Sequence, residues 1–267
     1  MPLLRFCSLS ASSKGNCYIL QSEDQLLCID LGISWKKIKD FLAKEQLLPS
    51  QIIGACISHE HNDHARGIPT FQKELSLPVH CNFYTAEALC EIYATALHCK
   101  IFTNEEKFIL GPFSITPFGL AHDASDPVGF RVVCGSYQLA ICTDLGFIHP
   151  GITHYLRDLD ALVIESNHDI ELVKTSQRPD LYKQRVLSRC GHISNKECAR
   201  LLTQIYTSRL KNIVLAHLSE DCNDGKLALE ESKHSILLAQ QKLGFTTHCE
   251  VSLAPPSTPS EWIVLEK

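Results

Sequence analysis

Apolar residues occur along this chain in short runs, and most runs end at a polar or turn-forming residue. The runs are rich in Ile, Val, Leu and Phe, which favour β-strands, and they alternate with stretches in which apolar residues recur at helical spacing. This alternation has no internal repeat and predicts two β-sheets. The predicted strands are Leu26 to Asp30, Ile52 to Ser58, Leu77 to Cys81, Phe113 to Phe118, Gly129 to Cys134, Tyr137 to Asp144, Ala161 to Glu165 and Asn212 to His217.

The stretches with helical spacing predict helices at Ser34 to Lys44, Thr85 to Leu97, Ser194 to Tyr206 and Lys226 to Leu243. The third helix has the sharpest start, because Ser194 precedes Glu197 at the spacing of a capping box. Near the end of the chain, the proline-rich segment Leu253 to Ser260 predicts a surface loop before a last short strand, Trp262 to Leu265.

Composition is consistent with a compact globular protein. The chain has 267 residues, of which 45% are hydrophobic and 21% charged, so it can bury a full core. No stretch reads as a linker, and we expect one domain over residues 1–267. No apolar run approaches the roughly 20 residues of a membrane helix, and the first residues lack the order of a signal peptide. We therefore expect a cytoplasmic protein with no membrane partner.

The 13 cysteines are an odd number and form no C-x-x-C pair, which indicates neither a disulfide framework nor a thiolate zinc site. We interpret them mainly as small buried hydrophobic residues.

Candidate chemistry is concentrated in one run, Ser58 to His64, which follows a predicted strand. His59 and His61 can point to one side of the strand end, while Asp63 and His64 turn back toward a neighbouring point. This spacing suits two adjacent divalent ions, and imidazole with carboxylate favours zinc, manganese or iron over calcium. The simpler alternative is a polar turn of solvated histidines.

This H-x-H-x-D-H run resembles the signature of the metallo-β-lactamase superfamily, which implies an αββα sandwich and further ligands downstream. His122, Asp144 and His217 each follow an apolar run, in the required order. Any one of them alone could be an ordinary core or surface group. The resemblance assigns His59, His61 and His122 to one metal, Asp63, His64 and His217 to the other, and Asp144 to a bridging position.

Further motifs resemble the YycJ/WalJ group of that superfamily, bacterial proteins regarded as DNA exonucleases and related to tRNA 3′-processing endonucleases. The resemblance extends from Leu9 to about Asn223, through Leu9 to Tyr18, Ile29 to Gly32, His122 to Phe130, Glu165 to Asp169 and Arg189 to Asn195. The first loop departs from the group's Gly-Ser-Ser-Gly-Asn, because Ala11 to Asn16 reads Ala-Ser-Ser-Lys-Gly-Asn.

The chemistry implied by the resemblance is hydrolysis. Two cations about 3.5–4 Å apart can share a water or hydroxide and brace the oxygens of an in-line displacement. No G-x-S-x-G elbow indicates a serine nucleophile. A phosphodiester leaving group needs a proton, and by analogy with the tRNA-processing nucleases Glu165 would orient His192 to donate it. Asp63, Glu165 and His192 are the expected catalytic residues. The alternative for His192 is simple solvation at the start of a helix.

Charge points less clearly to a substrate. The chain has a net charge of −5, yet Lys174 to Lys211 holds nine basic residues and two acidic ones, a local balance of +7. This segment brackets His192 and favours a polyanion, so we expect nucleic acid, most simply DNA, as the substrate. A hydrolase of small esters or thioesters, of the glyoxalase II or lactonase type, is the alternative. A non-catalytic metal-binding module is a third hypothesis. DNA or RNA, and exonuclease or endonuclease action, both stay open.

Overall fold

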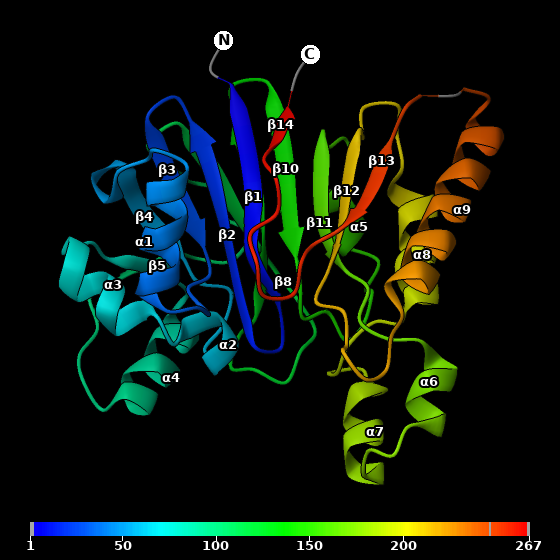
Figure 1. The fold of residues 1–267 in the computed structure, drawn as a ribbon, viewed down its shortest axis with the longest axis horizontal. Coiled ribbons are helices and arrows are strands. Elements are labelled where there is room, and N and C mark those ends of the chain that lie inside the picture. Colours follow the sequence, from blue (N-terminus) through cyan, green and yellow to red (C-terminus); the bar gives the residue numbers. More distant parts are fainter. Residues whose placement is uncertain (1–2, 246, 266–267) are drawn as a thin grey trace.

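Two β-sheets stack face to face between two layers of helices in the computed structural model, which describes residues 3–245 and 247–265 (Figure 1). Helices α1, α3 and α4 lie on the left of the sandwich in this view, and α8 and α9 lie on the right. The predicted αββα sandwich is therefore confirmed. Within the described ranges, no helix is both long enough and apolar enough to cross a membrane.

The first sheet has seven described strands. In spatial order they are β14 (Ile263–Leu265), β1 (Leu4–Ser12), β2 (Gly15–Ser22), β3 (Gln25–Ile29), β4 (Ile52–Cys56), β5 (Val79–Cys81) and β6 (Cys99–Ile101). Pairs from β14 to β3 are antiparallel, whereas pairs from β3 to β6 are parallel. The sheet thus has one antiparallel half and one parallel half.

The second sheet repeats this plan with seven described strands. In spatial order they are β13 (Glu250–Leu253), β12 (Asn212–Ala216), β11 (Ala161–Glu165), β10 (Tyr137–Cys142), β9 (Val128–Cys134), β8 (Phe113–Gly119) and β7 (Phe108–Leu110). Pairs from β13 to β10 are parallel, whereas pairs from β10 to β7 are antiparallel.

The described helices lie in the connections between parallel strands. They are α1 (Trp35–Lys44), η1 (Pro49–Gln51), α2 (Asn62–Ala65), α3 (Ile68–Leu75), α4 (Phe83–Tyr93), α5 (Ile152–Leu156), α6 (Ile170–Thr175), α7 (Asp180–Val186), α8 (Asn195–Ile205) and α9 (Gly225–Leu243). Helix α8 begins with the predicted capping box, in which Ser194 and Glu197 satisfy each other's backbone N–H groups.

Three apolar layers hold the four structural layers together. Leu20 and Phe130 belong to the central layer between the two sheets. Ile19 points the other way and packs with Ile38 and Phe71 under α1 and α3. A third layer joins the second sheet to α5, α8 and α9. Because both faces of each sheet are buried, the strands read as nearly continuous apolar runs.

Several element boundaries differ from those predicted. Helix α4 ends at Tyr93 instead of Leu97, because Ala94 adopts a left-handed conformation with φ of 48°. Strand β10 ends at Cys142, so Asp144 lies in the loop after it. The predicted C-terminal loop is also fastened to the first sheet, since the carbonyl oxygen of Pro256 accepts hydrogen bonds from two serines of β1. Nine of the 13 cysteines are buried and all thiols are free, as the sequence indicated.

Candidate metal centre

The seven candidate ligands follow strand ends at one edge of the sandwich, the lower end in Figure 1. Parallel strands place their carboxyl ends at the same edge, which brings residues far apart in sequence together. His59 and His61 follow β4, and His122 follows β8. Asp144 follows β10, and His217 follows β12.

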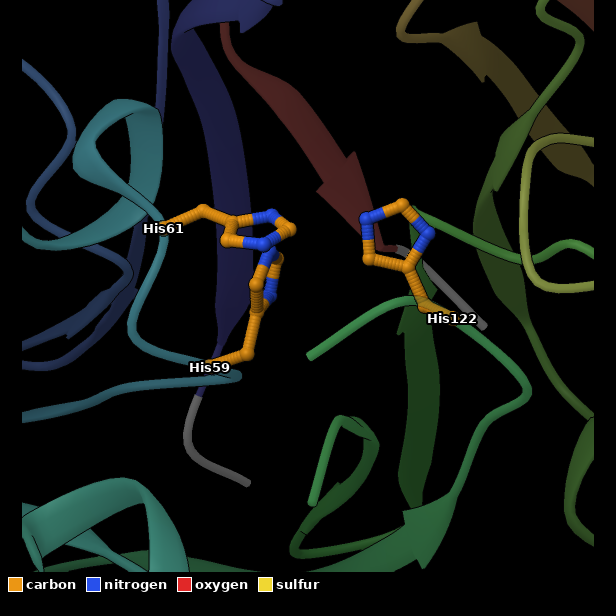
Figure 2. A group of neighbouring side chains, drawn as sticks. All are labelled: His59, His61 and His122. Carbon is orange, nitrogen blue, oxygen red and sulfur yellow. The ribbon is translucent and has the colours of Figure 1, made fainter. Parts of the chain in front are cut away.

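His59, His61 and His122 form the first ligand group. One ligand atom from each lies within 4.8 Å of the others, so the three can hold a common metal ion. Figure 2 shows the two imidazoles of the β4 loop facing His122 across a small space. The ring centroids of His59 and His122 are 5.3 Å apart, and those of His61 and His122 are 5.2 Å apart.

Asp63, His64 and His217 form the second ligand group, with ligand atoms again within 4.8 Å of one another. Asp144 lies between the two groups. Its Oδ2 atom is 2.9 Å from His64 Nε2, and its Oδ1 atom is 3.6 Å from both His122 Nε2 and His217 Nε2. One carboxylate can therefore reach both groups.

Backbone conformation at the strand ends is unusual. Asp30, Asp144 and His217 have φ angles of 59°, 60° and 56°, a left-handed conformation that residues other than glycine rarely adopt. Each lies directly after, or two residues after, a strand that ends at this edge. Such backbone strain is typical of functional sites, where it turns a side chain toward the centre.

Hydrogen bonds orient the imidazole rings of three candidate ligands. His64 Nδ1 donates to Asp30 Oδ2 over 2.8 Å, and His122 Nδ1 donates to the carbonyl oxygen of Gly191 over 3.0 Å. His217 Nδ1 lies 3.2 Å from Glu165 Oε1. In all three, Nδ1 makes the supporting contact, so Nε2 is the nitrogen that would bind a metal, which is the usual arrangement of metal-ligating histidines.

Asp30, Ser58 and Asn16 support the centre, although no role for them was predicted from the sequence. Asp30 accepts hydrogen bonds from the Ser58 backbone N–H at 2.8 Å and from its hydroxyl at 2.9 Å. The same hydroxyl lies 3.0 Å from His59 Nδ1, so one carboxylate braces residues of both ligand groups. Asn16 Nδ2 approaches His64 Nε2 at 2.9 Å and Asp63 Oδ2 at 3.4 Å. The signal available in the sequence was a carboxylate directly after an apolar run, which marks Asp30 but not its partners.

Glu165 and His192 lie beside the candidate ligands. Glu165 is fully buried at the end of β11, and its Oε1 atom is 2.7 Å from His192 Nδ1. Its other oxygen accepts hydrogen bonds from the backbone N–H groups of Leu145 and Ile193. The His192 ring packs against that of His217, with centroids 5.2 Å apart. The structure thus brings all nine candidate residues to one place.

Carboxylates surround the second ligand group and change its proton affinity. Burial alone would lower the pKa of His217, but Asp144, Asp63 and Glu165 outweigh it and raise that pKa to about 10. Burial opposes the same effect at His64, where the neighbouring carboxylates hold the pKa well above its usual value. Without a metal, these two histidines therefore bind protons at neutral pH.

In the first ligand group, two histidine pKa values are lowered instead of raised. Burial lowers the pKa of His59 well below its usual value and also lowers the pKa of His122. For Glu165, burial alone would raise the pKa, but the contacts with His192 and His217 outweigh it and lower the pKa to about 2. Neutral imidazoles and an ionised carboxylate thus coexist within one buried site.

The donor set fits a divalent transition metal. Imidazole nitrogen and carboxylate oxygen are ligands of zinc and of manganese. Within the described residues, the buried Nε2 atoms of His59 and His217 have no hydrogen-bond partner. Buried polar atoms are rarely left unpaired, and a metal ion would satisfy both of these.

The basic segment from Lys174 to Lys211 is more neutral in space than in sequence. Four of its nine basic residues pair with carboxylates: Lys174 with Glu171, Arg178 with Asp221, Arg185 with Asp123 and Arg209 with Asp160. The Arg185 pair joins α7 to the residue after His122 over 2.6 Å. Arg189 lies over the Phe147 ring, 3.9 Å from its centroid.

Comparison with known proteins matches this chain to a family. Residues 13–186 match the model of the metallo-beta-lactamase superfamily. The chain is 28% identical to the exodeoxyribonuclease YycJ of Bacillus anthracis over 97% of this chain and 98% of that protein. It is 29% identical to the exodeoxyribonuclease WalJ of Streptococcus pneumoniae over 95% of each. The resemblance to the YycJ/WalJ group is therefore confirmed.

Solved structures share the fold at lower identity. YhfI from Bacillus subtilis, a metallo-beta-lactamase fold protein, superposes with a TM-score of 0.71 at 15% identity, covering 98% of this chain and 99% of YhfI. The short form of human tRNase Z superposes with a TM-score of 0.61 at 17% identity, covering 96% of this chain and 98% of that structure. These two similarities concern the fold alone.

Proposed function

The chain belongs to the metallo-beta-lactamase superfamily, and we propose that it is a binuclear metal-dependent phosphodiesterase, a nuclease of the exodeoxyribonuclease type. Two curated relatives that match this chain over nearly their whole length are named exodeoxyribonucleases. The proposal extends their activity to this chain because the residues that the reaction needs lie together in one site.

Two divalent ions, zinc or manganese, are the proposed cofactors. His59, His61 and His122 would hold one ion, Asp63, His64 and His217 the other, and Asp144 would contact both. Bound there, the ions would supply Lewis acidity toward the attacking water and toward both oxygens of an in-line displacement. Asp63 is placed to orient that water as well, since its side chain is 23% exposed at the edge of the site.

The hydrogen bond between Glu165 and His192 carries the proposal. A sugar alkoxide is a poor leaving group unless an acid protonates it. The contact between His192 Nδ1 and Glu165 Oε1 orients the imidazole and leaves its Nε2 atom available to donate a proton to the leaving oxygen. Its side chain is 11% exposed, enough to meet a substrate, while Glu165 stays fully buried and holds the ring in place.

Small esters are the competing substrates. Thioesters and lactones need no Glu165–His192 pair for hydrolysis at two metals, so the pair would have no task in such an enzyme. The metal ligands alone do not distinguish these substrates, because a phosphodiesterase and a small-ester hydrolase would use the same metal site. The contact between His192 and the buried Glu165, beside the candidate ligands, supports the phosphodiester.

The test is a comparison of substrates with manganese-loaded and zinc-loaded protein. Single-stranded and double-stranded DNA, labelled at either the 5′ or the 3′ end, should be shortened stepwise from one end. A matched RNA should be cleaved more slowly, and a glutathione thioester should react only weakly.

An Asp144→Ala variant serves as the control for contaminating nucleases, because it should lose cleavage of every substrate. Rapid thioester hydrolysis without DNA cleavage would refute the nuclease proposal and support the small-ester hydrolase instead.

A further inference from the structure

A hollow of about 630 Å³ lies between the first turn of α1 and helix α3, two helices that pack on the outer face of the first sheet. Four cationic side chains line it, Lys36, Lys37, Lys39 and Arg66, against one carboxylate, Glu74. The hydroxyl-bearing residues Ser34 and Thr70 complete the polar lining. This hollow lies outside the basic segment that the sequence singled out.

Most of the positive charge in the hollow is uncompensated. Glu74 is engaged by Lys39, at 3.9 Å, and by the indole N–H of Trp35, at 3.3 Å. Over residues 3–245 and 247–265, no carboxylate lies within ion-pair distance of Lys36, Lys37 or Arg66. The positive end of the α1 dipole adds to the same field, since its first turn lines the hollow.

Arg66 connects the hollow to the metal centre. It caps α2 two residues after His64, and its guanidinium donates to the backbone carbonyl of Lys14. The Lys14 loop leads within two residues to Asn16, whose side chain contacts His64 and Asp63. Contacts through Arg66 and the loop from Lys14 to Asn16 therefore link the lining of the hollow to the second ligand group.

We propose that this hollow binds backbone phosphates of the polynucleotide substrate, at nucleotides displaced from the scissile bond. The inference rests on the proposed nuclease function, because a polynucleotide held at the metal centre is the polyanion that would pass the neighbouring cations. Lys36 and Lys37 are exposed and unpaired by acids, so they can reach phosphates without breaking an existing ion pair.

The size of the effect follows from counterion release. Each phosphate contact on a single strand contributes about 0.7 to the slope of log affinity against log salt. Loss of two contacts should flatten that slope by about 1.4, which corresponds to about 25-fold weaker binding at 0.1 M salt relative to 1 M salt.

The experiment uses a Lys36→Gln/Lys37→Gln variant, which removes two charges while keeping long polar side chains. The matched control is Lys44→Gln/Lys73→Gln, which removes two exposed lysines from the same helices, α1 and α3, outside the hollow. Binding of a labelled phosphorothioate single strand to manganese-loaded protein is followed by fluorescence anisotropy across a salt series. Cleavage of unmodified DNA by the wild-type protein is measured in parallel.

The variant should bind about 25-fold more weakly at 0.1 M salt with a flatter slope, while the control stays within about twofold. If both double variants retain the wild-type slope while the wild type cleaves DNA, the hollow is not a phosphate site and the nuclease function stands. If the wild type binds the strand through these lysines but cleaves no nucleic acid, the hollow is upheld and the nuclease function fails. A protein that neither binds nor cleaves nucleic acid refutes both.

Discussion

Removal of the His192 imidazole is the most direct test of the proposed mechanism. His192→Ala removes the imidazole that lies 2.7 Å from Glu165 Oε1, whereas the second partner of that oxygen, the proposed metal ligand His217, stays in place. The change should therefore affect proton donation while leaving both ligand groups in place.

The fold should tolerate this substitution. Glu165 keeps three partners, namely His217 and the backbone N–H groups of Leu145 and Ile193. Loss of one hydrogen bond to a buried carboxylate, with the others retained, costs about 1–3 kcal/mol. Thermal unfolding should show a reduced melting temperature but a cooperative transition.

The catalytic effect should be larger and selective. A positioned general acid contributes about 10²–10⁴-fold, so the rate of DNA cleavage should fall by that factor. The same loss equals about 2.7–5.4 kcal/mol of activation free energy. A phosphodiester with a nitrophenolate leaving group should react at nearly the wild-type rate, because that anion departs without a proton.

The assay is single-turnover cleavage of end-labelled DNA beside hydrolysis of the nitrophenyl ester, with metal content measured by mass spectrometry. His234→Ala, an exposed histidine of α9, is the matched control and should change neither rate. Added imidazole should partly restore DNA cleavage in His192→Ala. Unchanged DNA cleavage would refute the general-acid role, and loss of a metal ion would show that His192 is a ligand.

Three further predictions concern the ligand groups. Asp144→Ala should reduce metal content below two ions per chain and abolish hydrolysis, as measured by elemental analysis and activity; retention of both ions would exclude a bridging role. Gly32→Ala should destabilise the protein and weaken metal binding, because the new Cβ would lie 1.6 Å from the Asp63 carbonyl oxygen, whereas Gly119→Ala meets nothing within 4 Å and should be silent in thermal unfolding. Metal binding at the second ligand group should release protons at neutral pH, since the raised pKa values of His64 and of His217, the latter about 10, keep both rings protonated until the metal displaces the protons. Its apparent affinity should rise about tenfold per pH unit for each proton released, and calorimetry in two buffers counts the protons; a pH-independent affinity would contradict the reasoning.

Sequence patterns located the strands that precede the candidate ligands because those strands are buried on both faces. Ile52 to Ser58 and Asn212 to His217 read as continuous apolar runs, and the observed strands β4 and β12 lie within them. The capping box at Ser194 was equally local and was also found as predicted. Signals that depend on neighbours in sequence were therefore reliable.

Features that depend on distant residues could not be found in this way. Strand β1 is buried yet contains Ser8, Ser10 and Ser12, so its polar composition hides a core strand. Asp30 supports His64 across 34 positions of sequence, and no local pattern indicates that contact. The short helices α6 and α7 were missed because isolated helices of this length have little intrinsic stability and depend on packing against the rest of the protein.

The distribution of charge also depends on residues that are distant in sequence, and it affects how a substrate would approach. The balance of +7 counted from Lys174 to Lys211 includes only acids inside that segment, whereas Asp123, Asp160 and Asp221 pair with its arginines from outside. Free positive charge is therefore weaker on the α7 side than the sequence indicated, and stronger in the hollow beside α1. If both sides contact phosphates, the scissile bond lies between them at the metal centre. Salt dependence of binding should then respond more to the α1 lysines than to Arg185, whose charge Asp123 already neutralises.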